Sequence, residues 1–242
     1  MASSLFISDL HLSEERPSAN EAFFAFLEEK ASRAAALYIL GDLFEYWIGD
    51  DDLEDPFNAV VAGFLSNLGK SGVAVHVLHG NRDFLMGERF ATATGAHLVP
   101  DPTRAELPGG PALLLHGDTL CTDDTDYQEW RRTARSDNWQ ADFLGRGLPE
   151  RRQIIHGLRE KSRAVIQAKP AEIMDVNEVA VQQAFREHAV RRMIHGHTHR
   201  PGRHSHLVDG QRCERWVLPD WYGPGGYLEV AESGAPKLVS FA

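Results

Sequence analysis

Residues 4–11 read SLFISDLH, a short apolar run that ends in an aspartate and a histidine. A run this short with polar residues after it is typical of a buried β-strand. The arrangement recurs four times, each time with a metal-ligand residue type at the end: residues 36–42 (ALYILGD), 73–81 (VAVHVLHGN), 112–116 (ALLLH) and 192–199 (RMIHGHTH). This repetition predicts five buried strands and an α/β fold.

The segments between these runs have helical periodicity. Residues 22–33 (AFFAFLEEKASR) and 56–68 each carry an apolar stripe, which predicts two amphipathic helices. The end of the chain is different, because its short apolar runs are separated by Gly, Pro and Asp. They predict antiparallel strands at residues 206–208, 215–218, 227–230 and 237–241.

Length and composition indicate one globular domain, residues 1–242, with 43% hydrophobic and 25% charged residues. The net charge of −10 is not that of a general nucleic-acid binder, so we expect no nucleic-acid partner. Two cysteines in no zinc-finger or disulfide spacing favour a reducing compartment. No apolar run approaches the ~20 residues of a membrane span, and no feature indicates an obligate protein partner.

Residues 122–170 carry few strand signals and predict a helical insertion. The insertion is rich in bases, whereas residues 42–55 contain seven acids and no base. Both segments are compatible with ordinary solvated helix faces. The alternative is a helical lid, residues 122–170, that meets an anionic ligand or lipid headgroups.

The polar residues at the strand ends carry the chemistry. In open α/β sheets, ligands bind at the carboxyl ends of the strands, so these side chains are expected to converge. A single histidine in such a place is more often structural than a ligand. Seven ligand-type residues in order favour a metal site over that alternative: Asp9, His11, Asp42, Asn81, His116, His197 and His199.

These seven side chains offer carboxylate, amide and imidazole donors and no thiolate. Such donors suit Mn²⁺, Fe²⁺ or Mg²⁺, and they also admit Zn²⁺. Seven donors are too many for one tetrahedral ion, and they suit two cations roughly 3.5–4 Å apart. A cation pair lowers the pKa of a bridging water, so that hydroxide forms near neutral pH, and it clamps a phosphorus centre.

In their order and spacing, Asp9-x-His11, Gly41-Asp42, Gly80-Asn81, His116 and Gly196-His197-x-His199 resemble the signature of the calcineurin-like metallophosphoesterases. The resemblance implies a four-layer αββα sandwich, here with an inserted helical lid, and two divalent metal ions. It places Asp9, His11 and His199 on one metal, with Asn81, His116 and His197 on the other. Asp42 is then the bridging ligand.

One residue departs from the common family pattern. Many members have histidine after the Gly-Asn pair, whereas this chain has Arg82. Arginine is a poor proton donor at neutral pH but a good fixed charge for a phosphoryl oxygen. The change favours a leaving group that needs no proton, such as the phosphate of a pyrophosphate. We therefore expect Arg82 to act electrostatically beside Asp42 and Asn81.

Longer strings narrow the resemblance: residues 41–50 (GDLFEYWIGD), 80–85 (GNRDFL) and 172–177 (EIMDVN). They resemble the branch of the family that hydrolyses the pyrophosphate of UDP-2,3-diacylglucosamine to UMP and 2,3-diacylglucosamine 1-phosphate (lipid X) in lipid A biosynthesis. That resemblance implies Mn²⁺ as the metal. It also implies a UDP-linked diacylated substrate and a peripheral place on the cytoplasmic face of the inner membrane. The alternative is a generic dimetal phosphodiesterase or nucleotide pyrophosphatase.

Substrate contacts follow partly from the same resemblance. The resemblance places Asp124, Ser162 and Lys169 at positions used for substrate. The expected set also includes Asn81, Arg82 and His197 and the lid residues Tyr127, Arg159 and Ile166. Some relatives have Asn where this chain has Ile166, so one polar contact is lost or replaced here. Nearby aromatics are expected either to line an acyl groove or to belong to the core: Phe44, Tyr46, Trp47 and Phe84. We also expect Asp118 to orient His116, and Trp221 and Tyr222 to lie near the mouth of the site.

Overall fold

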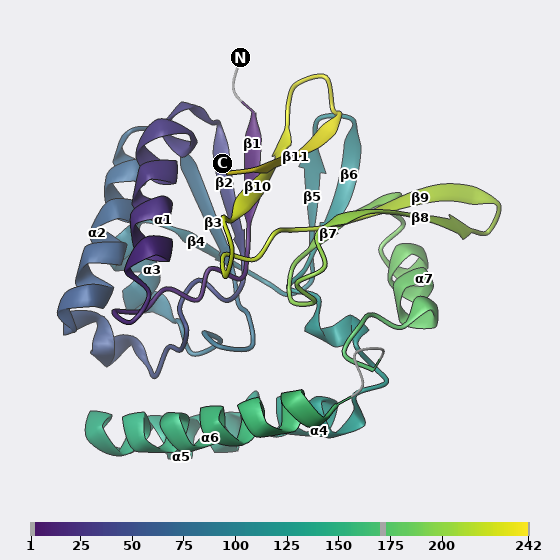
Figure 1. The fold of residues 1–242 in the computed structure, drawn as a ribbon. Coiled ribbons are helices and arrows are strands. Elements are labelled where there is room, and N and C mark those ends of the chain that lie inside the picture. The colour runs from purple at the N-terminus through teal and green to yellow at the C-terminus, as the bar shows by residue number, and fades with distance from the viewer. Residues whose placement is uncertain (1–2, 170–172, 242) are drawn as a thin grey trace.

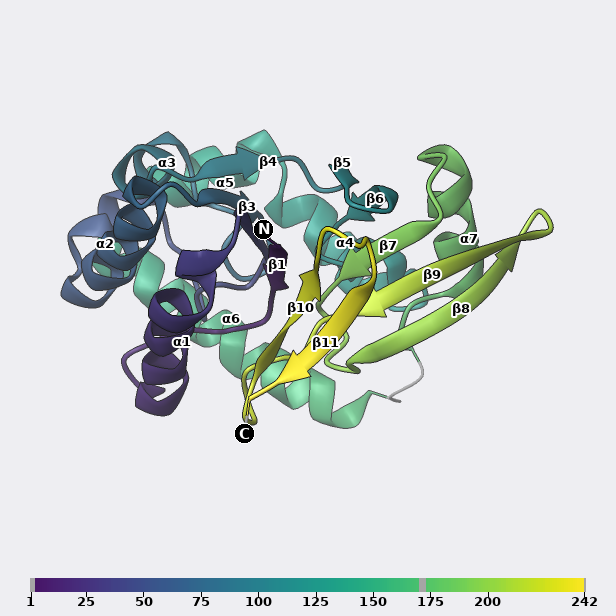
Figure 2. The same ribbon diagram turned by 90° about the horizontal axis from the view of Figure 1, so that it is seen from above.

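The structure is a computed structural model that describes residues 3–169 and 173–241, with the backbone alone for 161 and 163–168. Two mixed β-sheets form its centre (Figures 1 and 2). The first sheet has the order β11-β10-β1-β2-β3-β4, and its strands β1 to β4 are parallel. Its strands are β1 (Ser4–Ile7), β2 (Ala36–Leu40), β3 (Ala74–Leu78), β4 (His97–Val99), β10 (Gly226–Val230) and β11 (Pro236–Ser240).

The second sheet has the order β5-β6-β7-β9-β8. In its middle, β6, β7 and β9 are parallel, whereas β5 and β8 pair antiparallel at the two edges. The strands are β5 (Thr103–Leu107), β6 (Gly110–Leu114), β7 (Arg192–His195), β8 (Gly202–Val208) and β9 (Gln211–Val217).

Alternation along the strands separates the layers. Leu5 and Ile7 of β1 point into the cluster beneath the helices α1 (Pro17–Glu29), α2 (Pro56–Lys70) and α3 (Glu88–Thr94). Phe6 points the other way, into a cluster between the two sheets. Helix α7 (Glu178–Glu187) packs on the outer face of the second sheet. The four layers are therefore helix, sheet, sheet and helix, which confirms the predicted αββα sandwich.

Several boundaries differ from the sequence predictions for physical reasons. The predicted helix 22–33 instead begins at Pro17, a good first-turn residue, and ends at Glu29 before a separate 3₁₀ turn, Ala31–Arg33. Strand β5 was not predicted, because it is an edge strand with outward-facing Arg104 and Glu106 and no apolar run. The β8–β9 hairpin is longer than predicted, because the first half of each strand is mainly polar and lacks an apolar run.

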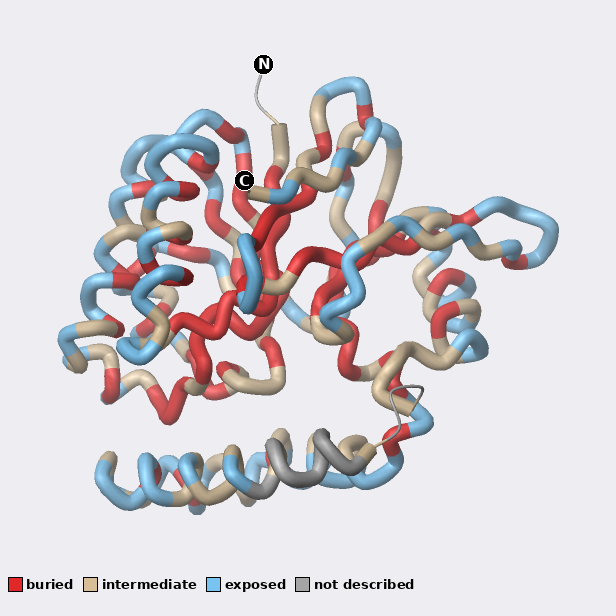
Figure 3. Tube along the Cα trace, viewed as in Figure 1, coloured by how far each residue is buried: buried red, intermediate tan, exposed pale blue. Residues whose placement is uncertain are grey.

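Residues 122–170 contain three helices: α4 (Thr125–Ala134), α5 (Asp137–Leu144) and α6 (Leu148–Ala168). They lie beyond the carboxyl ends of β1, β2 and β3, with α6 running across that end of the molecule (Figure 1). Burial is concentrated in the strands and the loops that follow them, whereas α6 is largely exposed or half-buried (Figure 3). Among the helices described, none combines the length and apolar character that crossing a membrane requires.

Candidate metal centre

All seven predicted ligand residues lie together at the carboxyl ends of the strands. Asp9 and His11 follow β1, Asp42 follows β2, and Asn81 follows β3. The remaining three follow strands of the second sheet: His116 after β6, and His197 and His199 after β7. Asp9, His11, Asp42 and His116 are buried, while His199 is exposed at the rim. Both sheets therefore contribute to one site.

The backbone at this site has an unusual conformation. Five of the seven residues have a left-handed backbone, with φ of 54° at Asp9, 51° at His11, 53° at Asp42, 68° at His197 and 52° at His199. Asp and His tolerate this region better than most residues, but it still costs energy. Hydrogen bonds hold the strained loops together, since Leu10 N donates to Asp42 O at 2.9 Å. Such strain is concentrated at functional sites in proteins.

Two glycines leave room for the carboxylates. A Cβ atom on Gly80 would lie 2.1 Å from Oδ1 of Asp42, and one on Gly196 would lie 2.1 Å from Oδ2 of Asp9. Any other residue at either position would therefore displace a predicted ligand. This steric requirement explains why Gly precedes Asn81 and His197.

The first group of donors is formed by Asp9, His11 and His199, whose donor atoms all lie within 4.8 Å of one another. Oδ1 of Asp9 is 3.4 Å from Nε2 of His199. Ser8 and the backbone N–H of His197 donate to the other oxygen of Asp9. Within the described residues, Oδ1 of Asp9 and Nε2 of His11 are buried without a hydrogen-bond partner. Lone pairs so oriented fit a cation.

The second group of donors converges on Asn81. Its Oδ1 lies 2.9 Å from Nε2 of His116 and 3.0 Å from Nδ1 of His197. Asp42 lies between the two groups, with Oδ2 3.7 Å from Nε2 of His11 and Oδ1 3.8 Å from Nε2 of His116. Each carboxylate oxygen of Asp42 therefore faces a different group, as a bridging ligand requires.

The buried carboxylates attract positive charge. Burial lowers the pKa of His116, but the carboxylates of Asp42 and Asp9 outweigh it and raise that pKa to about 9. Burial and the charge of His116 lower the pKa of His197 to about 4. The carboxylates thus favour positive charge at this position. Divalent cations on the oxygen and imidazole donors would balance the negative charge of the carboxylates, so the residues fit the two ions that the sequence implies.

Three supporting contacts were not predicted. The buried carboxylate of Asp83 accepts from the backbone N–H groups of Leu43 at 2.7 Å and Gly80 at 2.8 Å, which fixes the loops after β2 and β3. Oδ1 of Asp101 accepts from His116 N at 3.1 Å. Oε2 of Glu45 lies 3.3 Å from Nδ1 of His11. Only Asp83, inside the Gly-Asn-Arg-Asp string, and Glu45, three residues after Asp42, had a sequence signal.

The expected role of Asp118 is wrong. Nδ1 of His116 lies 2.9 Å from the backbone oxygen of Leu40, which orients the ring. Asp118 instead accepts from the hydroxyl of Tyr127 and from Nε of Arg131, both at 2.7 Å. It therefore ties α4 to the loop after β6.

The residues suggested for substrate lie in two places. Arg82 and Tyr127 adjoin the metal centre: Arg82 N donates to Oδ1 of Asp42 at 2.9 Å, and the Tyr127 ring lies 5.7 Å from that of His197. Arg159 of α6 also reaches inward, since its NH2 atom lies 2.6 Å from Oε1 of Glu45. Asp124 and Lys169 pair with one another at 2.5 Å.

Helix α6 ends at Ala168, so Lys169 lies just beyond the helix that carries Ser162. Ser162 is half-buried. The side chain of Ile166 lies outside the described residues, and its predicted role stays a prediction.

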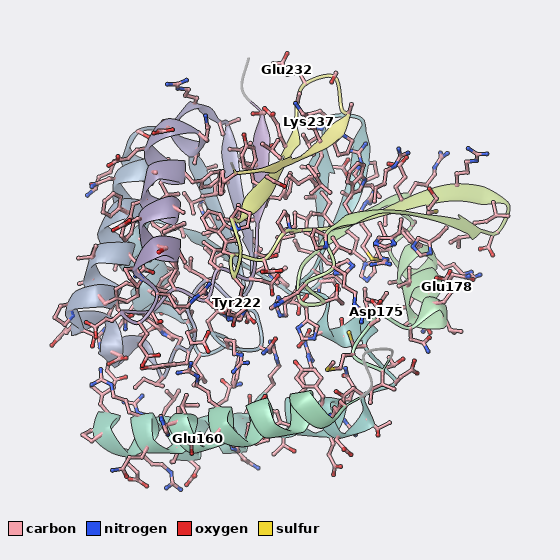
Figure 4. All side chains as sticks on the ribbon, in the orientation of Figure 1. Glu160, Asp175, Glu178, Tyr222, Glu232 and Lys237 are labelled. Carbon is pink, nitrogen blue, oxygen red and sulfur yellow. The ribbon has the colours of Figure 1, made fainter. Side chains whose placement is uncertain are left out.

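The aromatic residues divide between core and site. Phe44 and Trp47 are buried in the core, so the core alternative holds for both. The side chain of Trp221 is also buried in the core, although its backbone N–H donates to Asp9 O at 3.1 Å beside the site. Tyr222 lies near the site as expected, with its ring 5.1 Å from that of His11. Figure 4 shows Tyr222 on the part of the core that faces α6, the helix that carries Glu160.

Half-buried Tyr46 and Phe84 remain available beside the site. Guanidinium groups from α6 and the end of α4 lie over their rings, with Arg159 5.3 Å from the ring centre of Tyr46 and Arg135 5.3 Å from that of Phe84.

Comparison with known proteins agrees with this geometry. The profile of the calcineurin-like phosphoesterase family matches residues 3–201. A UDP-2,3-diacylglucosamine hydrolase of Aromatoleum aromaticum is 51% identical over 99% of this chain and 97% of its own length. Those of Cellvibrio japonicus and Pseudomonas paraeruginosa are 48% and 47% identical, each over 95% of both chains. The chain therefore belongs to the calcineurin-like phosphoesterase family and, within it, to the family of the UDP-2,3-diacylglucosamine hydrolases.

Proposed function

We propose that this protein hydrolyses the pyrophosphate of UDP-2,3-diacylglucosamine to UMP and 2,3-diacylglucosamine 1-phosphate. The observation that carries the proposal is the convergence of the seven donors with Arg82, in a chain about half identical to hydrolases of that name. The same donors support two divalent cations in the site, with Mn²⁺ as the proposed metal because its preferences cover carboxylate, amide oxygen and imidazole. When bound, the cations supply positive charge to phosphoryl oxygens and activate water near neutral pH.

Arg82 supplies a fixed positive charge from the protein itself, in addition to the charge of the metal ions. Its backbone is fixed by the hydrogen bond from its N–H to Asp42 and by another from Trp47 N to its carbonyl. Within the described residues, Nε of Arg82 is buried and has no hydrogen-bond partner. A guanidinium in that state fits a phosphoryl oxygen, because its planar donors match phosphate geometry and it cannot lose its proton. A sugar phosphate leaves without being protonated, so a fixed charge suffices.

The helices α4 to α6 are proposed to be a lid over the substrate. Tyr127 and Arg159 reach from the lid toward the metal centre, and Asp124, Ser162 and Lys169 extend the contacts along it. Lys169 is engaged with Asp124, so an incoming phosphate would compete for the same ammonium group. Ile166 offers no polar atom, and the amide contact of some relatives must come from another residue here.

A peripheral place on the cytoplasmic face of the inner membrane is also proposed, because the proposed substrate carries two acyl chains. Two of the described exposed large hydrophobic residues, Trp130 and Leu144, lie in α4 and α5. Arg132 and Arg146 adjoin them in the chain. Exposed aromatic and aliphatic side chains beside cations are suited to a lipid surface with anionic headgroups.

The test is an assay with Mn²⁺ that compares UDP-2,3-diacylglucosamine with UDP-N-acetylglucosamine and with bis(p-nitrophenyl) phosphate. We expect strong preference for the diacylated nucleotide. Equal turnover of the aryl diester would instead establish the generic phosphodiesterase. The sugar phosphate is the proposed leaving group, so water should attack the phosphorus nearer the uridine. In ¹⁸O-labelled water the label should then appear in UMP, and label in the lipid product would contradict this leaving group.

A further inference from the structure

We propose that Glu45 is a positioning residue that orients His11 for the metal centre and, through Arg159, holds helix α6 over it. The inference deepens the proposed function at the same site. Its metal part does not depend on which nucleotide is the substrate.

The carboxylate of Glu45 is buried and is shared between two partners. Its Oε2 is 3.3 Å from Nδ1 of His11, and its Oε1 is 2.6 Å from the NH2 atom of Arg159. The backbone N–H of Glu45 donates to Leu12 O at 3.0 Å, which fixes the loop beside His11. A single side chain thus connects the loop after β1 with Arg159 of helix α6, which lies 114 positions after Glu45.

The contact with His11 decides which ring nitrogen is free. A carboxylate beside Nδ1 favours the tautomer with its proton on Nδ1, because a proton there is attracted to the negative oxygen. The lone pair is then on Nε2, which is the nitrogen directed toward Asp42. Histidine ligands commonly need such a partner to fix their ring and raise their basicity. Glu45 therefore prepares His11 as a metal ligand.

The contact with Arg159 fixes the lid. The two side chains are 15% and 8% exposed, so solvent and salt screen their attraction less than that of a surface pair. The guanidinium also lies over the ring of Tyr46, the residue next to Glu45. The one negative charge of Glu45 therefore contacts both His11 and Arg159.

The test uses Glu45→Gln, which keeps the size and one acceptor oxygen, and Glu45→Leu, which removes both oxygens. Metal-stripped protein is titrated with Mn²⁺ by calorimetry, and kcat and KM are measured separately. We expect Mn²⁺ affinity to fall about 10- to 100-fold, the range typical for losing the partner of a ligating histidine. The loss should be smaller for Glu45→Gln than for Glu45→Leu. KM should also rise, because Arg159 loses its anchor.

Two further variants separate the roles. Arg159→Met should raise KM and leave Mn²⁺ affinity near that of the unmodified protein, because His11 keeps its partner. Glu54→Gln lies in the same acidic segment, is 88% exposed and should change neither. Circular dichroism and thermal melting establish that Glu45→Gln is folded.

Unchanged Mn²⁺ affinity in folded Glu45→Gln and Glu45→Leu would overturn the metal part. Unchanged KM in Arg159→Met would overturn the lid part. If the protein fails to hydrolyse UDP-2,3-diacylglucosamine but the Mn²⁺ result holds, the proposed function falls and the role of Glu45 in metal binding stands.

Discussion

The strand-end site and the helices α4 to α6 are held in place by different forces. The ligand loops are largely buried apart from the exposed His199, follow the hydrogen-bonded strands directly and keep a left-handed backbone at five of seven residues. Of the α6 side chains that the structure describes, only Arg151 is buried. Apolar packing contributes to its first half through Ile154 and Ile155, which are only partly buried. The strand-end loops are therefore preorganised by buried hydrogen bonds, whereas helix α6 is attached to the rest of the protein largely by ion pairs.

The charges that attach the lid come from the two biased segments of the sequence. Arg151 pairs with Asp51 and donates to Ile48 O, while Arg152 pairs with Asp52. Arg159 pairs with Glu45 in the same way. The acidic stretch 42–55 and the basic helix therefore neutralise one another. The charge pattern had two readings, solvated helix faces or a helical lid that meets an anionic ligand or lipid headgroups. Neither reading predicted that these three arginines pair with acids of the same chain.

Asp42→Asn should cause the largest loss of activity among the substitutions considered at the predicted metal centre. Asparagine tolerates the left-handed backbone and keeps the shape, so only the charge is lost. Because each oxygen of Asp42 faces a different donor group, we expect kcat/KM to fall by at least about 10³-fold. A folded variant with activity within tenfold of the unmodified protein would contradict the bridging role.

Arg82 tests the fixed charge without touching the ligands. Arg82→Met should lower kcat by about 10²–10³-fold, the usual effect of losing one group that stabilises charge in the transition state. Arg82→Lys keeps the charge but not the planar fork, so its loss should be smaller. Mn²⁺ stoichiometry should stay the same in both. A kcat that responds to neither substitution contradicts an electrostatic role.

On the lid side, Arg151→Met should affect stability and KM more than kcat. The substitution leaves Ile48 O without its charged donor, which costs about 2 kcal/mol, or roughly 4–8 °C in Tm for a chain of this size. Arg152→Met is the matched control. Its side chain is 45% exposed, and its pairing should contribute about 1 kcal/mol or less. Equal melting temperatures of the two variants would contradict a stabilising role for the buried contacts of Arg151.

The same contrast explains what the sequence could predict. Apolar runs that end in Asp, Asn or His lie at strand ends for reasons of local pattern, so the seven donors were predictable from the residues. The αββα layers were predictable only from the resemblance to the family. Asp101 and Leu40 O support His116 from positions distant in the chain, and no local pattern indicates such contacts. The pairing of Arg159 with Glu45 likewise depends on how α6 is placed, which only the folded chain determines.

The most direct test of the central claim is a titration of metal-stripped protein with Mn²⁺, in which binding and hydrolysis of UDP-2,3-diacylglucosamine are measured together. We expect two Mn²⁺ ions per chain, with no turnover before metal is added and full turnover only when both are bound. Full hydrolysis by the stripped protein in the presence of a chelator, or saturation of activity at one ion per chain, would contradict the two-metal site.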